Sequence, residues 1–324
     1  FGYWGFLIWG FYFLTCFYFC VIEPKVKFFE IPWVKFLNNV VIIGTCAFTA
    51  YLLLSNLPWY LPELGDGSNV IPAFYLIVLA AICFAVYSST DIKYVRFLSI
   101  ATTWLFIALI GFMWADAFLF GDSELSAFTK NIGLIGNYFA NINEFVLPLN
   151  DYHEFYLFWW FAWSIMIGQF TSRFVGGLKT YQVLGAMLIF PSIPIAIWFS
   201  VLYHYHEAGI PTEGIKNFAM VFVGIVFVIN SLDSLIRLYT DNLNLTVKRF
   251  GKFKYIAMNV VALSLLTLLF KLEFLQIQWV GALVIGLFFI CLGFIAYSKL
   301  KTVSNIEGSP KANKIDYTKI ETIS

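Results

Sequence analysis

The stretch YLFWWFAWSIMIGQF, residues 156–170, is almost wholly apolar and carries Trp159, Trp160 and Trp163 within five positions. Such a run is typical of a helix that crosses a membrane, because a spanning helix needs about 20 mostly apolar residues. Tryptophan in membrane proteins usually lies in a belt at the water interface, where part of its ring is wet. Three tryptophans so close together on one helix raise the question of what else they do.

The composition of the whole chain is that of a membrane protein. Of its 324 residues, 60% are hydrophobic and 12% are charged, which favours a polytopic helical bundle over a soluble domain. The net charge is +1 and no basic block is present, so no nucleic-acid partner is expected. The sequence has no phosphate loop, Ser-His-Asp order, paired carboxylates or zinc spacing, so neither an enzyme nor a metal site is predicted.

Hydropathy predicts an all-α fold of nine membrane spans, followed by a polar cytoplasmic tail at 299–324. An outer loop at 121–154 separates the fourth and fifth spans, and its residues 125–142 are amphipathic, as in a helix that lies along the membrane surface. The predicted spans are 2–22, 38–57, 70–89, 97–120, 155–172, 181–203, 217–238, 254–271 and 275–298.

The distribution of lysine and arginine predicts how these spans are oriented. Seventeen of the twenty basic residues fall on one set of loops and span ends, and only Lys130, Lys216 and Lys271 fall on the other. Positive charge collects on the cytoplasmic side of membrane proteins. The C-terminus is therefore expected in the cytoplasm and residue 1 outside. The chain opens with Phe1 as if in mid-helix, so it is expected to be an interior fragment.

Aromatic side chains share one face on two of the predicted helices. At about 100° per residue, Trp159, Trp160 and Trp163 form one sector of their helix, and the first span carries Trp4, Trp9 and Tyr12 in the same way. Two such faces can form a cage for a quaternary ammonium group, which the electron-rich rings attract and which has no N–H to satisfy. The alternative is an ordinary aromatic belt facing lipid or the interface.

The sequence around these tryptophans resembles the signature helix pair of the betaine/carnitine/choline transporter family. The opening YWGFLIWGFY, the segments SSTDIKYVRFLS and GNYFANI, and the later VINSLDS are also similar to family segments. The residues that match the signature are Trp159, Trp160, Trp163, Gly168, Arg173, Gly177, Leu184, Gly185, Pro191, Trp198, Phe199 and Ser200.

The resemblance implies a twelve-span transporter of the inner cell membrane, of which these nine spans would be the fourth to the twelfth. Its core would be the inverted repeat of the leucine-transporter type, with the site near the middle of the bilayer. Residues 1–120 would hold four spans of the first repeat, without its leading helix, and residues 155–298 the complete second repeat. A homotrimer, with the helix at 125–142 taking part, is a further expectation from the family.

The resemblance also assigns the aromatic residues to a substrate. Trp4, Trp9, Tyr12, Trp160 and Trp163 would surround a trimethylammonium group, and Trp159 would serve a neighbouring site on the cytoplasmic side. The family often has Ser-Pro-Phe after the third tryptophan. Here Ser164 is followed by Ile165 and Met166, which leaves the bend of this helix open.

Polar residues within the spans point to the coupling ion. Thr45 and Thr49 lie four residues apart and Asn230 and Ser231 stand at the family's sodium-ligand positions, so these oxygens are candidate sodium ligands. A threonine hydroxyl that bonds to its own helix is the alternative. Asp233 is an intramembrane carboxylate, but Arg237 one turn later predicts a local ion pair that keeps it charged.

The sequence thus predicts a secondary transporter of betaine, choline, carnitine or a similar zwitterion, driven by sodium and without a bound cofactor. Substrate exchange by a protein of the same family is the first alternative. A sodium-coupled amino-acid transporter with the same core is the second. A membrane protein that senses solute or catalyses a reaction without moving solute is the third.

Overall fold

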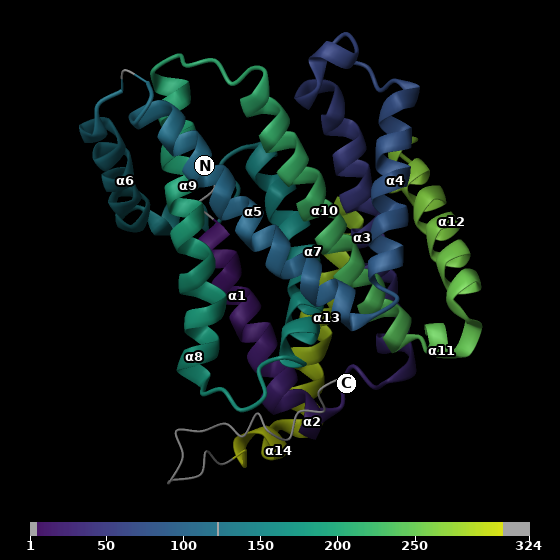
Figure 1. Cartoon of the computed structure of the whole chain (residues 1–324). Helices are drawn as coiled ribbons and strands as arrows, with labels where there is room; N and C mark the ends of the chain where they lie inside the picture. Colours follow the sequence, from purple (N-terminus) through teal and green to yellow (C-terminus); the bar gives the residue numbers. More distant parts are fainter. Residues whose placement is uncertain (1–4, 122, 307–324) are drawn as a thin grey trace. The chain divides into compact units, whose positions relative to one another are not determined.

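The structure of the chain is a computed structural model that describes residues 5–121 and 123–306. Within these ranges every regular element is helical (Figure 1). The elements are α1 (Gly5–Phe17), η2 (Tyr18–Ile22), α2 (Glu23–Val26), α3 (Pro32–Tyr60), η3 (Pro62–Leu64), α4 (Pro72–Ser88), α5 (Ile92–Phe118), α6 (Leu125–Ala140), η4 (Ile142–Phe145), α7 (Asp151–Ser172), α8 (Thr180–Leu184), η5 (Gly185–Ile189), α9 (Phe190–Glu207), α10 (Ile215–Asn242), α11 (Val247–Phe250), α12 (Lys252–Lys271), α13 (Ile277–Phe294), η6 (Ile295–Lys299) and α14 (Leu300–Ser304).

Each of the nine predicted spans corresponds to a helix among the described residues, and the chain is a polytopic helical membrane protein. Seven of the described helices are long and apolar enough to cross a membrane. The other two predicted spans are α4, a shorter apolar helix of 17 residues, and α7. Helix α7 carries polar side chains such as Gln169 and Thr171 among its aromatic ones. Its composition therefore indicates a membrane span less clearly than that of its neighbours.

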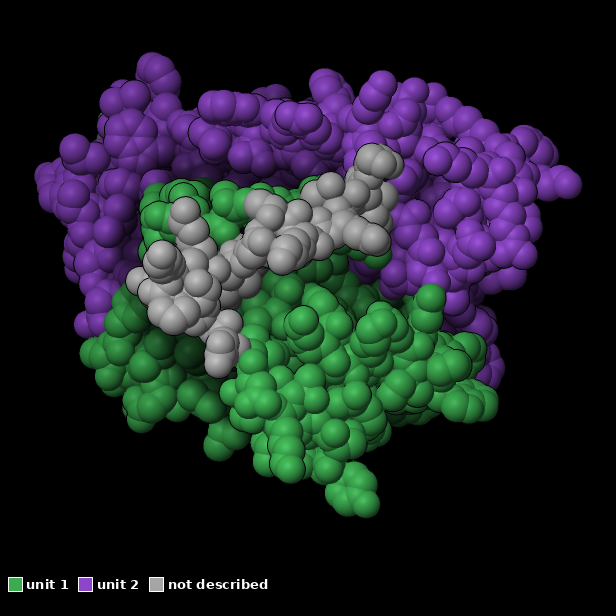
Figure 2. Space-filling model, turned by 90° about the horizontal axis from the view of Figure 1, so that it is seen from below, with its two compact units in different colours: residues 1–45, 138–195, 277–324 green, residues 46–137, 196–276 purple. Residues whose placement is uncertain are grey.

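The chain divides into two compact units, shown in separate colours in Figure 2. Unit 1 comprises Phe1–Thr45, Tyr138–Ile195 and Ile277–Ser324, and unit 2 comprises Cys46–Asn137 and Ala196–Gln276. Helices α3, α6 and α9 each contribute residues to both units. Both units draw helices from both predicted repeats, and the repeat symmetry itself stays a prediction.

Unit 1 is built around α7, which packs against α1 on one side and α13 on another. Two glycines allow these close approaches. A Cβ atom on Gly168 of α7 would lie 2.8 Å from the backbone of Thr15 on α1, and a Cβ on Gly281 of α13 would lie 2.9 Å from the carbonyl oxygen of Phe158 on α7. At both contacts the neighbouring backbone comes so near that only glycine fits.

Unit 2 is built around α10, which packs against α4 and α5, while α12 packs against α4. One apolar cluster joins α5, α9 and α10 and includes Met113, Val201 and Val223. Helix α6 lies against this cluster through Phe128, whose ring is 5.5 Å from that of Phe118. The predicted amphipathic helix therefore exists, and Phe128 packs on this cluster.

The last span continues further than the sequence predicts. Helix α13 passes through η6 into α14 and ends at Ser304, inside the segment expected to be a polar tail. Helix α14 contacts α2 in the same unit. The rest of that predicted tail, residues 307–324, lies outside the described residues.

Candidate functional site

Helix α7, which carries the three tryptophans, is an uninterrupted α-helix from Asp151 to Ser172. The side chain of Asn150 caps its start by accepting a hydrogen bond from the backbone N–H of His153, at 2.8 Å, and Asp151 and Glu154 in the first turn complement the helix dipole. No break follows Trp163. Without the family's proline after Trp163, α7 is therefore continuous, as expected where no residue interrupts the hydrogen bonds of the helix backbone.

Hydrogen bonds fix the register between α1 and α7. The hydroxyl of Thr15 donates to the carbonyl oxygen of Ser164 at 2.9 Å, and the hydroxyl of Tyr12 donates to the carbonyl oxygen of Trp160 at 2.8 Å. Both bonds reach from side chains of α1 to the backbone of α7, next to the close contact at Gly168. Each of these hydrogen bonds joins a side chain of α1 to one backbone position of α7. The two aromatic faces therefore pack against each other in a single register.

The aromatic residues of the two helices form one cluster. The rings of Trp9 and Trp160 lie 6.2 Å apart at an angle of 59°, and Tyr12 and Trp163 belong to the same group of packed side chains. Trp159 meets the rings of Trp160 and Trp163 edge to face, at 6.0 and 6.4 Å. The structure therefore brings together the described members of the predicted box. Trp4 lies outside the described residues.

Two indole N–H groups in this cluster are buried without an acceptor among the described residues. These are the Nε1 atoms of Trp159 and Trp163. A buried donor without a partner costs about 1–3 kcal/mol, so such a group is well suited to a ligand oxygen. The arrangement offers aromatic faces to a cation and N–H donors to an anionic group, which are the two ends of a zwitterion.

The cluster also contains residues that sequence reasoning missed. Tyr156, one turn before Trp160, packs edge to face on Trp159 at 5.7 Å. Tyr138, at the end of α6, and Met187, in η5, pack against the same cluster. The segment GNYFANI, which contains Tyr138, was one of those that resemble the transporter family. That resemblance was the available signal, because hydropathy places this residue only in a surface helix.

The four candidate sodium ligands are divided between the two units. Thr45 belongs to unit 1, whereas Thr49, Asn230 and Ser231 belong to unit 2. Both threonines are buried in α3. The side-chain oxygen of Asn230 accepts a hydrogen bond of 2.9 Å from Ser99 on α5. Sodium binding by these four residues stays a prediction.

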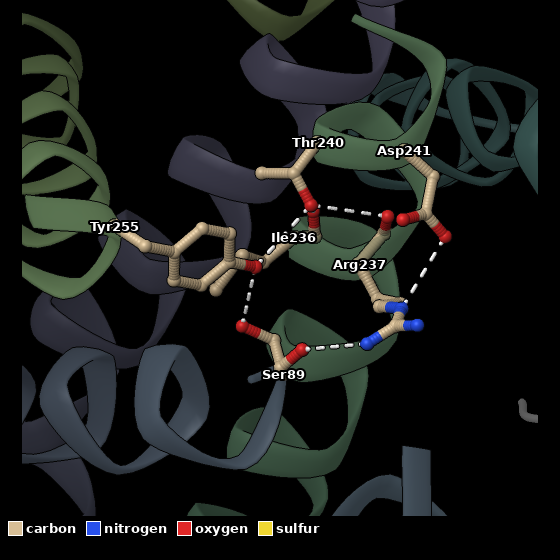
Figure 3. A network of polar contacts seen from close by, with 6 residues as sticks. All are labelled: Ser89, Ile236, Arg237, Thr240, Asp241 and Tyr255. Atoms are coloured by element: carbon tan, nitrogen blue, oxygen red, sulfur yellow. Dashed lines mark hydrogen bonds and ion pairs between the residues drawn. The ribbon is translucent and has the colours of Figure 1, made fainter. Parts of the chain in front are cut away.

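The predicted ion pair between Asp233 and Arg237 is wrong. Arg237 instead pairs with Asp241 at 3.3 Å and donates to the carbonyl oxygen of Ser89 at 3.4 Å (Figure 3). Asp233 is fully buried and accepts a hydrogen bond of 2.6 Å from Ser88. Sequence spacing could not decide the partner, because Arg237 lies four residues from both aspartates and can face either.

Comparison with known proteins points to membrane transporters. No protein-family model matches the chain. It is 25% identical over 140 residues to glycine betaine transporter 1 of Vibrio parahaemolyticus, a match covering 43% of this chain and 26% of that protein. It is 26% identical over 148 residues to the ectoine/glycine betaine/proline transporter EctP of Corynebacterium glutamicum, covering 43% and 23%. An uncharacterized transporter of Mycobacterium tuberculosis is 28% identical over 76 residues, covering 21% and 13%. The matched part of the chain thus spans about a quarter of the length of these relatives or less. Similarity to several transporters, two of them named for glycine betaine, agrees with the resemblance noted in the sequence.

Proposed function

We propose that this chain forms part of a secondary transporter of a quaternary ammonium zwitterion of the betaine type. The observation that carries the proposal is the aromatic cluster of α1 and α7, in which Trp9 faces Trp160 at 6.2 Å and two buried indole N–H groups have no acceptor among the described residues. Aromatic faces attract a cation without requiring a donor from it. The similarity to two transporters named for glycine betaine supports the same substrate class.

In the proposed complex the trimethylammonium group lies against the faces of Trp9, Tyr12, Trp160 and Trp163. The indole N–H groups of Trp159 and Trp163 donate to the carboxylate of the solute. Binding would then satisfy both donors that are buried in the free site. The described part of the cluster belongs wholly to unit 1, so it can keep its shape while access alternates between the two sides of the membrane.

Transport is proposed to be driven by sodium, with Thr45, Thr49, Asn230 and Ser231 as candidate ligands. Their neutral oxygens suit a hard cation that is held weakly. Exchange of one solute for another is the second mechanism. We also propose that the protein forms a homotrimer with a contact through α6. Its C-terminus is proposed to lie in the cytoplasm.

The test uses the full-length protein in proteoliposomes with radiolabelled glycine betaine. Uptake should occur under an inward sodium gradient, and unlabelled choline or carnitine should compete with the label more strongly than alanine does. Uptake that needs preloaded substrate and ignores sodium would replace symport by exchange. Absence of both uptake and exchange, or stronger competition by alanine, would overturn the betaine-type assignment.

A further inference from the structure

Two buried thiols in unit 1 take no part in the proposed substrate site. Cys16 lies in the last turn of α1, and Cys20 lies in the π-helical turn η2 that follows it. Their sulfur atoms are 4.0 Å apart and share a hydrogen bond. Cys16 has no exposed surface, Cys20 is 9% exposed, and both are free thiols. The pair is therefore a reduced dithiol that is largely shielded from water.

A third sulfur atom belongs to the same part of unit 1. Cys16 and Cys20 form an apolar cluster with Val175 and Val183, and Met187 packs against this cluster. Met187 lies in η5, which is a second π-helical turn and which packs against α1. Such turns are frequently found at functional sites. Two thiols and one thioether thus belong to a single packed group of side chains, which we call the thiol cluster.

The spacing of the two thiols fits one metal ion between them. A metal–thiolate bond is about 2.3 Å long, so two such bonds whose sulfur atoms are 4.0 Å apart enclose an angle of about 120°. This is the angle between ligands in a trigonal site, which has a position for a third ligand. Within the thiol cluster, Met187 is the residue that can supply this ligand.

The kind of ligand selects a soft ion. Thiolate and thioether sulfur suit copper(I), whereas a structural zinc ion is held by four ligands in a tetrahedron. Over residues 5–121 and 123–306, no group of three or more His, Cys, Asp or Glu side chains could hold a metal ion, so the pair lacks the further ligands that zinc requires. A thiol that binds as a thiolate releases its proton to water, and the positive ion offsets the charge that remains.

The thiol cluster is linked to the aromatic cluster of the proposed substrate site. Met187 packs against both clusters. On α1, Tyr12 lies one turn before Cys16, and its hydroxyl donates to the carbonyl oxygen of Trp160. A metal ion that draws the thioether of Met187 toward the thiols therefore changes how this side chain packs on the aromatic residues.

From these observations we propose that Cys16, Cys20 and Met187 form a binding site for a soft monovalent metal ion of the copper(I) class, and that this ion and the betaine-type solute oppose each other's binding. The metal site stands on the sulfur atoms alone. Only the opposition to the solute rests on the proposed function, because it acts through the aromatic cluster.

A first experiment measures metal binding by itself. The probe is copper(I), kept reduced with ascorbate and presented to the full-length protein in detergent in competition with the coloured chelator bathocuproine disulfonate. A variant whose only cysteines are Cys16 and Cys20 should withdraw one copper(I) per chain from the chelator. The matched control keeps Cys83 and Cys291 instead, which lie on α4 and α13 and share no hydrogen bond among the described residues. This control has as many thiols and should withdraw none.

X-ray absorption at the copper edge identifies the ligands. The variant that keeps the pair should show three sulfur neighbours at about 2.3 Å. Adding Met187→Leu, which keeps an apolar side chain of similar size but removes the thioether, should leave two. Nitrogen or oxygen neighbours in place of sulfur, or two sulfur neighbours in both proteins, would overturn the three-sulfur site.

A second experiment measures whether the metal and the solute oppose each other. Binding of radiolabelled glycine betaine to the full-length protein is titrated with the metal site empty and filled. The filled site should raise the Kd for betaine, and betaine should weaken copper(I) binding by the same factor, because coupling between two sites is reciprocal. In Cys20→Ser, which keeps every residue of the aromatic cluster, copper(I) should leave the Kd for betaine unchanged.

The outcomes separate this proposal from the proposed function. If the pair binds copper(I) but the protein binds no betaine with or without the metal, the proposed function has failed and the metal site stands. If the pair withdraws no more copper(I) than the control with Cys83 and Cys291, the metal site is overturned whatever the protein does with betaine. Equal affinity for betaine with the site empty and filled overturns the opposition between the two ligands.

Discussion

Trp163 shows what a single residue contributes to the proposed substrate site. Its ring packs in the aromatic cluster with Trp9, Tyr12 and Trp160, and its indole N–H is buried without an acceptor among the described residues. Trp163→Leu keeps an apolar side chain of moderate size but removes both the ring face and the donor. We expect betaine to bind about tenfold more weakly, which corresponds to roughly 1–2 kcal/mol for a cation over a dry ring. Fluorescence titration of the full-length protein with betaine and choline measures the effect.

The control for this substitution is Trp104→Leu on α5. That side chain is 66% exposed and lies in unit 2, outside the aromatic cluster, so binding should stay as in the wild type. Equal affinities for the wild type, Trp104→Leu and Trp163→Leu would remove Trp163 from the substrate site.

His153, at the start of α7, predicts a dependence of stability on pH. Its Nδ1 atom accepts a hydrogen bond of 3.1 Å from the backbone N–H of Leu149, and burial lowers the pKa of its imidazole below the usual value. The unfolded chain therefore takes up this proton more readily than the folded protein. The stabilisation is fully present above the unfolded pKa of about 6.5 and is lost as the pH falls through the lower folded pKa. His153→Gln should flatten the change of Tm across this range, whereas the exposed His206→Gln should not.

The sequence predicted part of the aromatic cluster, whose role as a substrate site stays a prediction. The tryptophan motif led to the aromatic cluster because ring position on a helix follows from a fixed rotation per residue. The partner of Arg237 could not be obtained in this way. Asp233 and Asp241 each lie four residues from Arg237. The sequence does not contain the contact with another segment, the hydrogen bond from Arg237 to the carbonyl oxygen of Ser89, that accompanies the pairing with Asp241.

At the scale of the element, the helices of unit 1 are held close by glycines. Gly168→Ala would place a Cβ atom 2.8 Å from the backbone of Thr15, and Gly281→Ala would place one 2.9 Å from the carbonyl oxygen of Phe158. Neither obstruction is a flexible side chain, so α7 must move away from α1 or from α13. We expect each substitution to destabilise the full-length protein by about 1–3 kcal/mol and to lower its Tm.

Gly286→Ala on α13 is the matched control. Apart from its chain neighbours and its own helix backbone, no atom of the described residues lies within 4 Å of the position that its Cβ would take, and alanine is a better helix former than glycine by up to about 1 kcal/mol. The Tm should therefore stay the same or rise. A fall in Tm as large as that of Gly281→Ala would show that helix packing is not the cause.

The positions of the helices could be predicted from the sequence better than their local departures from α-helical geometry. Long apolar runs located the seven described helices that are long and apolar enough to cross a membrane, because an apolar helix is the stable form of such a run in lipid. The one-turn π-helical segments at Tyr18–Ile22, Gly185–Ile189 and Ile295–Lys299 had no such signal. Turns of this kind are frequently found at functional sites.

At the scale of a whole unit, charged loops are arranged by sign at the ends of the helices. In unit 2, the loops that contain Glu63, Asp66 and Glu213 lie at one end of the helices, and the turns before Lys93 and Lys252 lie at the other (Figure 1). Hydropathy and charge along the chain predicted this alternation. The composition of the two units was not predicted, because it depends on contacts between segments far apart in sequence.

The same charge pattern predicts which loops face the cytoplasm. Four basic residues fall within seven consecutive positions in α11 and at the start of α12, namely Lys248, Arg249, Lys252 and Lys254. Basic residues near spans are retained on the cytoplasmic side. A single cysteine introduced at Asn69, in a full-length protein that lacks its native cysteines, should react with an impermeant thiol reagent added outside intact cells. A cysteine at Lys252 should react only after the membrane is opened, which also shows that this position is accessible to the reagent. The predicted orientation rests on seventeen basic residues on one side and three on the other. Labelling in the reverse pattern would contradict this orientation and the cytoplasmic location of the C-terminus.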